Sequence, residues 1–309
     1  MKNLQSLSNR LPPPKLSGIK LVLLSVFFSL SNQVWGQTRL GTDEFLMDVR
    51  RAEIATLEQL QSDMAGSDAV LLGEIHDNPR HHALRAQLLR EPALKQRNVV
   101  VEYLDAGQVV GAGDKLLPRL EQAGFDANGW QWPLHQPLFA AALDLGMAVY
   151  GGNLPRDQSR AVFKSRGNNL GAALQALLLH APLSDDSLAA LRREIDEDHC
   201  GALPSMMFEG MMAVQRARDA SMANEVMQHL PAVLLSGNGH AWKHLGVPHI
   251  LAANRPGMRS LSVLFLEHGP FADAAAQAEW LQSWQGKADY VWVTPPVSRP
   301  DPCLSLQKK

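Results

Sequence analysis

The stretch Val70-Leu71-Leu72-Gly73-Glu74-Ile75-His76-Asp77-Asn78-Pro79 is an apolar run that ends in a carboxylate and an imidazole two positions apart. An extended backbone points residues i and i+2 to the same side, so Glu74 and His76 should emerge together where a strand stops. Asn78 is a favourable N-cap, and Pro79 suits the first position of a helix. The stretch therefore predicts a strand, a short polar loop and a helix.

Short apolar segments rich in branched residues recur along the chain. They are almost continuously apolar rather than alternating, which is typical of strands that are covered on both faces. Helical patterns lie between several of them, and one is expected from Pro137 to Leu145. This alternation predicts an α/β fold with a mainly parallel central sheet flanked by helices. The expected strands are residues 69–72, 99–104, 147–150, 232–235, 261–266 and 290–293.

A long insertion, about residues 156–230, separates the third and fourth expected strands. Its apolar positions follow a helical period, so we expect an α-helical layer or cap on the sheet. No internal repeat, low-complexity tract or linker rich in Pro and Gly divides the chain. We therefore expect residues 37–309 to form a single domain that includes the helical insertion.

Residues 1–36 have the pattern of a secretory signal peptide, since four basic residues precede a short apolar run at 21–30. This run is shorter than the roughly 20 apolar residues that a membrane-spanning helix needs. The alternative is an uncleaved membrane anchor. Because no cysteine follows the run, nothing there can be lipidated, and membrane tethering is doubtful. We expect a periplasmic or secreted protein.

The charge balance excludes a strongly basic surface. Removing the four basic residues of the leading segment leaves 25 basic and 31 acidic residues, a formal charge of −6. Nucleic acids and anionic membranes both require clustered positive charge, so we expect neither as a partner. A small-molecule partner is favoured, and 46% hydrophobic residues with 19% charged residues suit a well-packed globule.

Two cysteines, Cys200 and Cys303, are the only ones in the chain. Outside the cytoplasm a disulfide between them would be stable. The alternative is two separate thiols, because the sequence does not give their distance in space.

Polar residues follow four of the expected strands. Ligands of parallel sheets bind just beyond the carboxyl ends of the strands, so these residues should converge on one rim. Each residue alone also has an ordinary structural explanation, such as an ion pair or a helix cap. Together they predict a site. They are Glu74 and His76 after the first strand, Glu102 and Tyr103 in the second, Asn153 after the third, and Ser236-Gly237-Asn238-Gly239-His240 after the fourth.

Glu74, His76 and His240 could hold a divalent metal ion or, with Glu102, act as a general acid/base set. The chain lacks the His-Glu-x-x-His helix that marks many zinc enzymes. It also lacks a Gly-rich phosphate loop and a Gly-x-Ser-x-Gly elbow, which disfavours nucleotide binding and serine hydrolase chemistry.

A methionine-rich segment of the insertion suits a large, flat apolar ligand such as haem, because methionine is flexible and polarisable. Arginines at its edge could pair with carboxylates of the ligand. Haem iron accepts imidazole, phenolate or thiolate, so Tyr103 and either His199 or Cys200 are candidate axial ligands, and the sequence does not decide between Tyr103 and His199. The alternative is that methionines at helical spacing are ordinary core residues. The candidate haem-binding residues are Tyr103, His199, Met207, Met211, Arg216 and Arg218.

Five motifs occur in order along the chain. They are Leu72-Gly73-Glu74-Ile75-His76-Asp77-Asn78-Pro79 with His82, Val101-Glu102, Asn153-Leu154-Pro155-Arg156, Gln215-x-x-Arg218-Asp219-x-x-Met222-Ala223, and Gly237-Asn238-Gly239-His240 to Gly246-Val247-Pro248. In this order they resemble the ChaN-like haem-binding uptake proteins of the Tiki superfamily, over about residues 43–266.

The resemblance implies an exported α/β protein that binds haem, is associated with iron acquisition and holds haem at a contact between two subunits of a homodimer. Some relatives in the wider superfamily are hydrolases that use positions matched here by Gly73, Glu74, His76, Gly237 and His240. We therefore expect a haem-binding protein rather than an enzyme. The alternative is a metal-assisted hydrolase of peptides or esters, in which Glu74, His76, Glu102 and His240 carry the chemistry.

Overall fold

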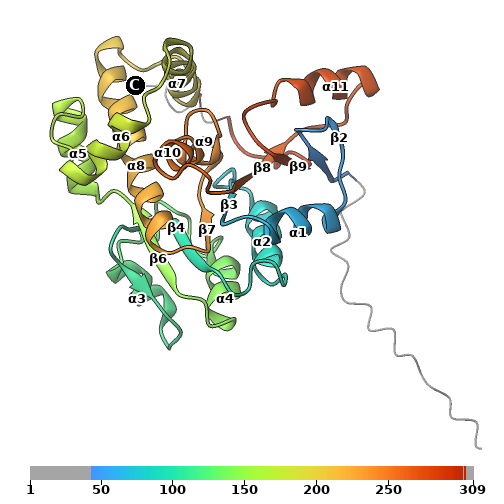
Figure 1. Ribbon diagram of the computed structural model, residues 1–309, viewed down its shortest axis with the longest axis horizontal. Helices are drawn as coiled ribbons and strands as arrows, with labels where there is room; N and C mark the ends of the chain where they lie inside the picture. Colours follow the sequence, from blue (N-terminus) through green and yellow to red (C-terminus); the bar gives the residue numbers. More distant parts are fainter. Residues whose placement is uncertain (1–42, 302, 304–309) are drawn as a thin grey trace, which may run out of the picture. The chain divides into compact units, whose positions relative to one another are not determined.

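The computed structural model describes residues 43–301 and 303. These residues form a nine-stranded sheet in the order β2-β1-β9-β8-β3-β7-β4-β6-β5 (Figure 1). The six strands from β9 to β6 in this order are parallel, while β1 and β2 at one edge and β5 at the other are antiparallel. The prediction of an α/β fold with a mainly parallel sheet is confirmed. The strands are β1 (Phe45–Asp48), β2 (Glu53–Ile54), β3 (Ala69–Leu72), β4 (Asn98–Asp105), β5 (Val109–Val110), β6 (Val149–Asn153), β7 (Ala232–Leu235), β8 (Ser260–Glu267) and β9 (Tyr290–Thr294).

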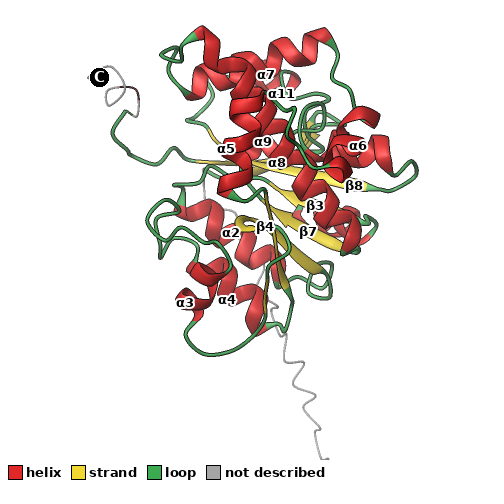
Figure 2. Ribbon diagram, turned by 90° about the vertical axis from the view of Figure 1, so that its left-hand side faces the viewer, coloured by secondary structure: helices red, strands yellow, loops and turns green. Residues whose placement is uncertain are grey.

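Helices cover both faces of this sheet (Figure 2). The helices α1 to α4 pack on one face and α5 to α11 on the other. They are α1 (Leu57–Ala65), α2 (Pro79–Leu89), α3 (Leu116–Gln122), α4 (Gln136–Asp144), α5 (Arg156–Ser165), α6 (Ala172–His180), α7 (Asp185–Asp198), α8 (Phe208–Gln228), α9 (Asn238–Ala241), α10 (Val247–Asn254) and α11 (Ala274–Gln282), with a short 3-10 turn at Ser205–Met207.

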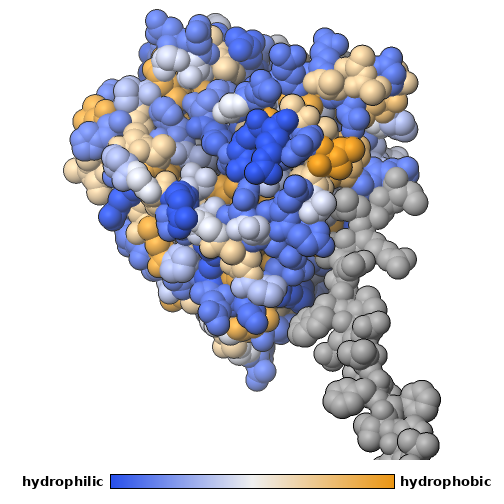
Figure 3. Space-filling view, turned by 45° about the vertical axis from the view of Figure 1, so that its right-hand side comes forward, coloured by the Kyte–Doolittle hydropathy of each residue, from blue (hydrophilic) through white to orange (hydrophobic). Residues whose placement is uncertain are grey.

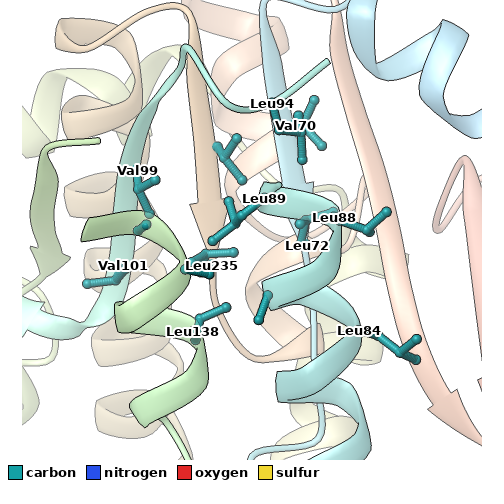
Figure 4. Packing of buried hydrophobic residues seen from close by; sticks show 14 of the residues in the cluster. Val70, Leu72, Leu84, Leu88, Leu89, Leu94, Val99, Val101, Leu138 and Leu235 are labelled. Carbon is teal, nitrogen blue, oxygen red and sulfur yellow. The ribbon is translucent and has the colours of Figure 1, made fainter. Parts of the chain in front are cut away.

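Alternate residues of the central strands supply the two halves of the core. Val70 and Leu72 of β3 point to the α2 and α4 side, where Leu88 and Leu138 meet them (Figure 4). Leu71, between them, packs in the cluster on the opposite face. Because all three strand residues are fully buried, β3 is apolar throughout, as a strand covered on both faces must be.

The helix after β3 begins as the sequence predicts. The Asn78 side chain accepts hydrogen bonds from the backbone N–H groups of Arg80, at 2.8 Å, and His81, at 3.2 Å. Pro79 occupies the first helical position, where it gives up no hydrogen bond. This cap fixes the sharp turn that carries Glu74 and His76 out of the sheet.

The predicted helical insertion is confirmed and contains α5 to α8. The long helix α8 packs against the sheet, where Met222 and Ala223 are fully buried. Helix α7 lies over α8 and ends next to Cys200, which forms a disulfide with Cys303 across a sequence separation of 103 residues. Of the two alternatives that the sequence leaves open, the structure therefore has the disulfide, which ties the end of α7 to the C-terminal segment.

The sequence did not predict the three antiparallel strands β1, β2 and β5. They have two to four residues, which is too short for a periodic pattern to stand out. The sequence analysis also placed the end of the third strand too early, at Tyr150, whereas β6 continues to Asn153 through two glycines. A side chain at Gly151 would overlap the backbone carbonyl of Asp105, so glycine allows β6 to approach β4 here.

The predicted signal peptide lies outside the described residues. Within 43–301 and 303, no helix is long and apolar enough to cross a membrane. On the face shown in Figure 3 hydrophilic residues predominate, and apolar residues form small separate patches. Such scattered apolar exposure is normal for a folded protein surface.

Candidate functional site

The carboxyl ends of three neighbouring strands, β3, β7 and β4, form the floor of a cleft of about 420 Å³. The structure brings together Glu74 and His76 after β3, Glu102 in β4 and His240 after β7. Helices α7 and α8 of the insertion supply the opposite wall. Its lining residues are Leu191, Glu194, Ile195 and Asp198 of α7 and Gln215, Arg218 and Asp219 of α8, and Trp242 and Leu245 complete the cleft.

Glu74 is the most heavily bonded group of the site. It is 2% exposed. Its Oε1 accepts a hydrogen bond from the Tyr103 hydroxyl at 2.6 Å and lies 3.0 Å from His76 Nδ1. Its Oε2 pairs with the Arg85 guanidinium and lies 3.1 Å from His82 Nδ1. The carboxylate is thus held on both oxygens.

Arg85, from α2, is a fully buried cation directly beneath the strand ends. Besides Glu74 it donates to the Tyr103 hydroxyl oxygen at 2.9 Å and to the backbone carbonyl of Leu72 at 3.3 Å. Burial raises the pKa of Tyr103 to about 12, so the phenol keeps its proton at neutral pH. The proposed ligand Tyr103 therefore lies below the cleft, with its hydroxyl already engaged by two groups.

A second network places His240 between two carboxylates. Its Nδ1 lies 2.6 Å from Asp219 Oδ1, and its Nε2 lies 3.3 Å from Glu102 Oε1. Although burial disfavours a charged imidazole, Glu102 and Asp219 together raise the pKa of His240 to about 10. His240 therefore carries a proton on each nitrogen at neutral pH.

Glu102 is ionised in this network. Burial alone would raise its pKa, but the charges of His240 and His76 and a hydrogen bond from the Gly237 N–H, at 2.7 Å, hold the pKa below its usual range. Burial raises the pKa of Asp219, the other partner of His240.

His76 is the imidazole that faces the cleft. Its side chain is 43% exposed, and Nε2 lies 4.0 Å from Glu102 Oε2. A Cβ atom at position 237 would lie 2.7 Å from Nε2, so Gly237 keeps the space beside this nitrogen open. The ring also contacts the edge of Trp130, with centroids 5.0 Å apart.

A neighbouring hollow of about 500 Å³ shares Glu102 and Arg218 with the cleft. Tyr103, Phe125 and Trp130 give it an aromatic side. Glu102 and Arg218 therefore border both hollows.

The three predicted metal ligands, Glu74, His76 and His240, do not come together around one point where an ion could bind. His240 has a carboxylate at each nitrogen, which separates it from Glu74 and His76. In the part of the chain that the structure describes, the group with mutually close ligand atoms is instead Glu74, His82 and His135, all buried and within 4.8 Å of one another. Burial lowers the pKa of His82 to about 4, so this ring is neutral. Because Arg85 already supplies a positive charge at Glu74, a divalent ion would meet electrostatic repulsion there.

Of the predicted haem-binding residues, Arg218 lines the cleft. Arg216 instead donates to the backbone carbonyls of Leu245 and Ala181. His199 lies at the end of α7, with Nδ1 2.7 Å from the Ile195 carbonyl oxygen.

The methionines do not line the cleft. Met211 packs against the apolar core beside the fully buried Met222, and Met207 ends the turn before α8. The position of Met211 agrees with the core interpretation, whereas Met207 belongs to no core cluster of the described residues, and Met206 before it is exposed.

Sequence reasoning missed Arg85, Asp219, His135 and Trp130 as parts of the site. Arg85 follows His82 by three residues and so shares its helix face, which is a usable signal. Asp219 belongs to the quoted motif of α8. His135 and Trp130 come from the long segment between α3 and α4, where no sequence pattern marks them.

A family model described as haem-binding uptake, Tiki superfamily, ChaN matches residues 60–251. Among solved structures, one titled as cofacial haem binding to ChaN of Campylobacter jejuni matches with a TM-score of 0.64 and 17% identity, covering 82% of this chain and 98% of that one. A second, from Bacillus cereus, covers 69% of each chain at 13% identity, but its TM-score of 0.33 is too low to carry an argument. No curated protein matches the sequence. The motif resemblance is confirmed, and the Campylobacter structure supports the fold.

Proposed function

Because this chain belongs to the haem-binding uptake family of the Tiki superfamily that includes ChaN, we propose that it binds haem in the cleft at the carboxyl ends of β3, β7 and β4. Haem combines a flat apolar ring, an iron that takes imidazole, and two carboxylates. The cleft offers apolar side chains from α7, a half-exposed imidazole at His76 and the cation Arg218. This combination in one hollow is the observation that carries the proposal.

The charges of the cleft restrict how haem would lie. Glu194 and Asp198 of α7 line it, and burial raises the pKa of Glu194 to about 7, so its charge is partly suppressed at neutral pH. Propionates are repelled by these carboxylates and attracted by Arg218, which also borders the second hollow. The propionate edge would therefore lie toward Arg218, which borders both hollows.

Titration of the purified chain with haem tests this proposal. We expect a saturable shift of the Soret band. Arg218→Gln should weaken binding about 10- to 150-fold, because a charge-assisted hydrogen bond is worth roughly 1.5–3 kcal/mol. Arg160→Gln is the matched control, since Arg160 is exposed on α5 and does not line the cleft. A spectrum that stays that of free haem would refute haem binding.

We further propose that the protein is exported to the periplasm or secreted and serves iron uptake. The basic and apolar leading segment supports export, and so does the disulfide, which persists in oxidising compartments. Fractionation of cells that produce the full chain, with N-terminal sequencing of the product, checks this. A cytoplasmic product with residues 1–36 intact and reduced cysteines would contradict export.

For iron uptake, growth of the source cells with haem as the sole iron source is the test. A deletion strain should grow poorly on haem and normally on inorganic iron. Equal growth of the deletion strain and its parent on haem would refute the role.

A homodimer is proposed for the haem-loaded form, because the similar Campylobacter structure is titled as cofacial haem binding. Light scattering on a sizing column, with and without haem, measures the mass directly. We expect twice the monomer mass with haem. A monomer at saturating haem would refute the dimer.

Acid/base hydrolysis is a second candidate function. The observation that favours it is the proton-bearing His240 near the half-exposed His76, with Glu102 between them. In such a reaction His76 would accept a proton from an attacking water, and His240 would give its proton to the leaving group. Glu74 is buried and bonded on both oxygens, so it supports His76 rather than acting as the base itself.

Ester and peptide substrates, assayed together with metal analysis, test this alternative. Glu102→Gln should abolish turnover while leaving the fold intact by circular dichroism. Absence of turnover and of bound divalent metal in the wild type would exclude it.

A further inference from the structure

The second hollow, of about 500 Å³, lies at the carboxyl ends of β4 and β6, where Asp105 and Asn153 line it. Its volume falls within the range of roughly 300–1,000 Å³ that is typical of pockets for small molecules. Charged side chains of both signs border it. Apart from Glu102, they are Asp105, Glu121, Asp126, Arg156 and Arg218.

These five charged side chains are not paired with one another. Within residues 43–301 and 303, none of them takes part in an ion pair, although both signs border the same hollow. Two buried polar atoms of the lining also lack a hydrogen-bond partner among these residues, namely Arg218 Nε and Asn153 Oδ1. Because buried polar atoms are almost always hydrogen-bonded in folded proteins, a ligand with its own donors and acceptors would fit here.

The two signs of charge come from different sides of the sheet (Figure 2). Arg156 begins α5 and Arg218 belongs to α8, and both helices pack on one face. Glu121 belongs to α3 and Asp126 follows it, on the other face. A molecule that carries a negative and a positive group can therefore meet both signs, whereas a simple anion would be repelled by the carboxylates and a simple cation by the arginines.

Asp105, at the end of β4, is a half-buried carboxylate without a cationic partner among the described residues. Burial and the charge of Asp157 raise the pKa of Asp105. A Cβ atom at position 124 would lie 2.5 Å from Asp105 Cγ, so Gly124 leaves room for this carboxylate. An ammonium group would supply the positive charge that Asp105 lacks.

Apolar side chains also line the hollow. Phe125 and Leu154 are buried, and Trp130 is half-buried with its ring centroid 5.1 Å from that of Tyr103. An apolar group of a ligand would therefore leave water here, which favours binding.

We propose that the second hollow binds a free α-amino acid with an apolar side chain. Its carboxylate pairs with Arg156 and Arg218, and its ammonium group donates hydrogen bonds to Asp105 and to Asn153 Oδ1. Its side chain packs on the aromatic side of the hollow. This binding site shares Glu102 and Arg218 with the haem cleft but takes a different ligand, so it goes beyond the proposed haem binding.

Isothermal titration calorimetry of the purified chain without haem, with L-phenylalanine as the probe, tests this site. We expect saturable binding at one site per chain. Phenethylamine lacks the carboxylate and 3-phenylpropanoate lacks the ammonium group. Each should bind about 10- to 150-fold more weakly than L-phenylalanine, because each loses charge-assisted hydrogen bonds.

Two variants each remove one charge from the hollow. Arg156→Gln and Asp105→Asn should each weaken the binding of L-phenylalanine by about 10- to 150-fold. Arg160→Gln on the same helix as Arg156, and Asp144→Asn at the end of α4, are the matched controls, since both residues are exposed and lie outside the lining of the hollow. The controls should keep the wild-type affinity, and circular dichroism verifies that all four variants are folded.

Three results would overturn the inference. They are the absence of saturable binding of L-phenylalanine at millimolar concentration, equal binding of the two singly charged analogues, and an unchanged affinity in Arg156→Gln or Asp105→Asn. Because this titration uses no haem, its failure is distinct from a failure of haem binding, which the Soret titration reports.

Discussion

The protonated His240 stabilises the folded protein, and this stabilisation should be lost as the pH rises from about 7 to 10. In the unfolded chain this imidazole loses its proton near its ordinary pKa of 6.5, whereas in the folded protein Glu102 and Asp219 raise the pKa to about 10. Between these values the folded state holds one more proton than the unfolded state. The stabilisation is therefore complete below pH 6.5 and is lost as the pH approaches 10.

The size of the effect follows from the same two pKa values. One extra proton changes the free energy of unfolding by about 1.4 kcal/mol for each pH unit, so the window from 6.5 to 10 gives at most about 5 kcal/mol. Few other groups interfere. Glu194, with a pKa of about 7, titrates only at the lower end of this window, Tyr103 has its pKa near 12, and neither cysteine is a free thiol.

Urea unfolding at pH 7.5, 8.5 and 9.5, followed by circular dichroism, measures this slope. The wild type should lose roughly 1 kcal/mol or more per pH unit. His240→Gln, which has no imidazole to titrate, should show a much flatter dependence. His180→Gln should retain the wild-type slope, because His180 is exposed on α6. An equally steep slope in His240→Gln, or a flat one in the wild type, would refute the charge assignment of the network.

Three further perturbations have defined outcomes. Cys200→Ser removes the disulfide across 103 residues and should lower the free energy of unfolding by about 2–5 kcal/mol. Thermal unfolding in oxidising buffer measures this loss, and an unchanged midpoint would contradict it. Arg85→Met leaves Glu74 as an unpaired buried charge and should lower the free energy of unfolding in urea by about 3–5 kcal/mol. A decrease of less than about 1 kcal/mol would show that the ion pair is not shielded from water. Gly237→Ala places a methyl group 2.7 Å from His76 Nε2, in the lining of the cleft, and should weaken haem binding several-fold with little change in stability, whereas unaltered affinity in the Soret titration would mean that haem binds outside this part of the cleft.

Local sequence signals predicted the central sheet well because its strands are buried on both faces. Segments such as Ala69–Leu72 and Ala232–Leu235 are apolar at every position, and these two match β3 and β7 to the residue. The Asn78–Pro79 cap likewise marks a helix start without any tertiary information. The short antiparallel strands lack such a signal, since pairing with an existing sheet edge, rather than periodicity, makes them extended.

One rule predicted that four polar residues lie close together: parallel strands end at the same edge of a sheet. These residues are Glu74, His76, Glu102 and His240. What each residue does there depends on distances that the sequence does not carry. Nothing local distinguishes the exposed ring of His76 from the enclosed ring of His240. The role of Arg85 depends on full burial against Glu74, and the methionines of α8 face the core rather than the cleft.

Locating the iron in crystals of the haem complex, by anomalous scattering at the iron edge, tests the central claim most directly. The account predicts iron in the cleft at the carboxyl ends of β3, β7 and β4. Iron bound at the methionines of α8, or elsewhere on the molecule with the cleft empty, would contradict it.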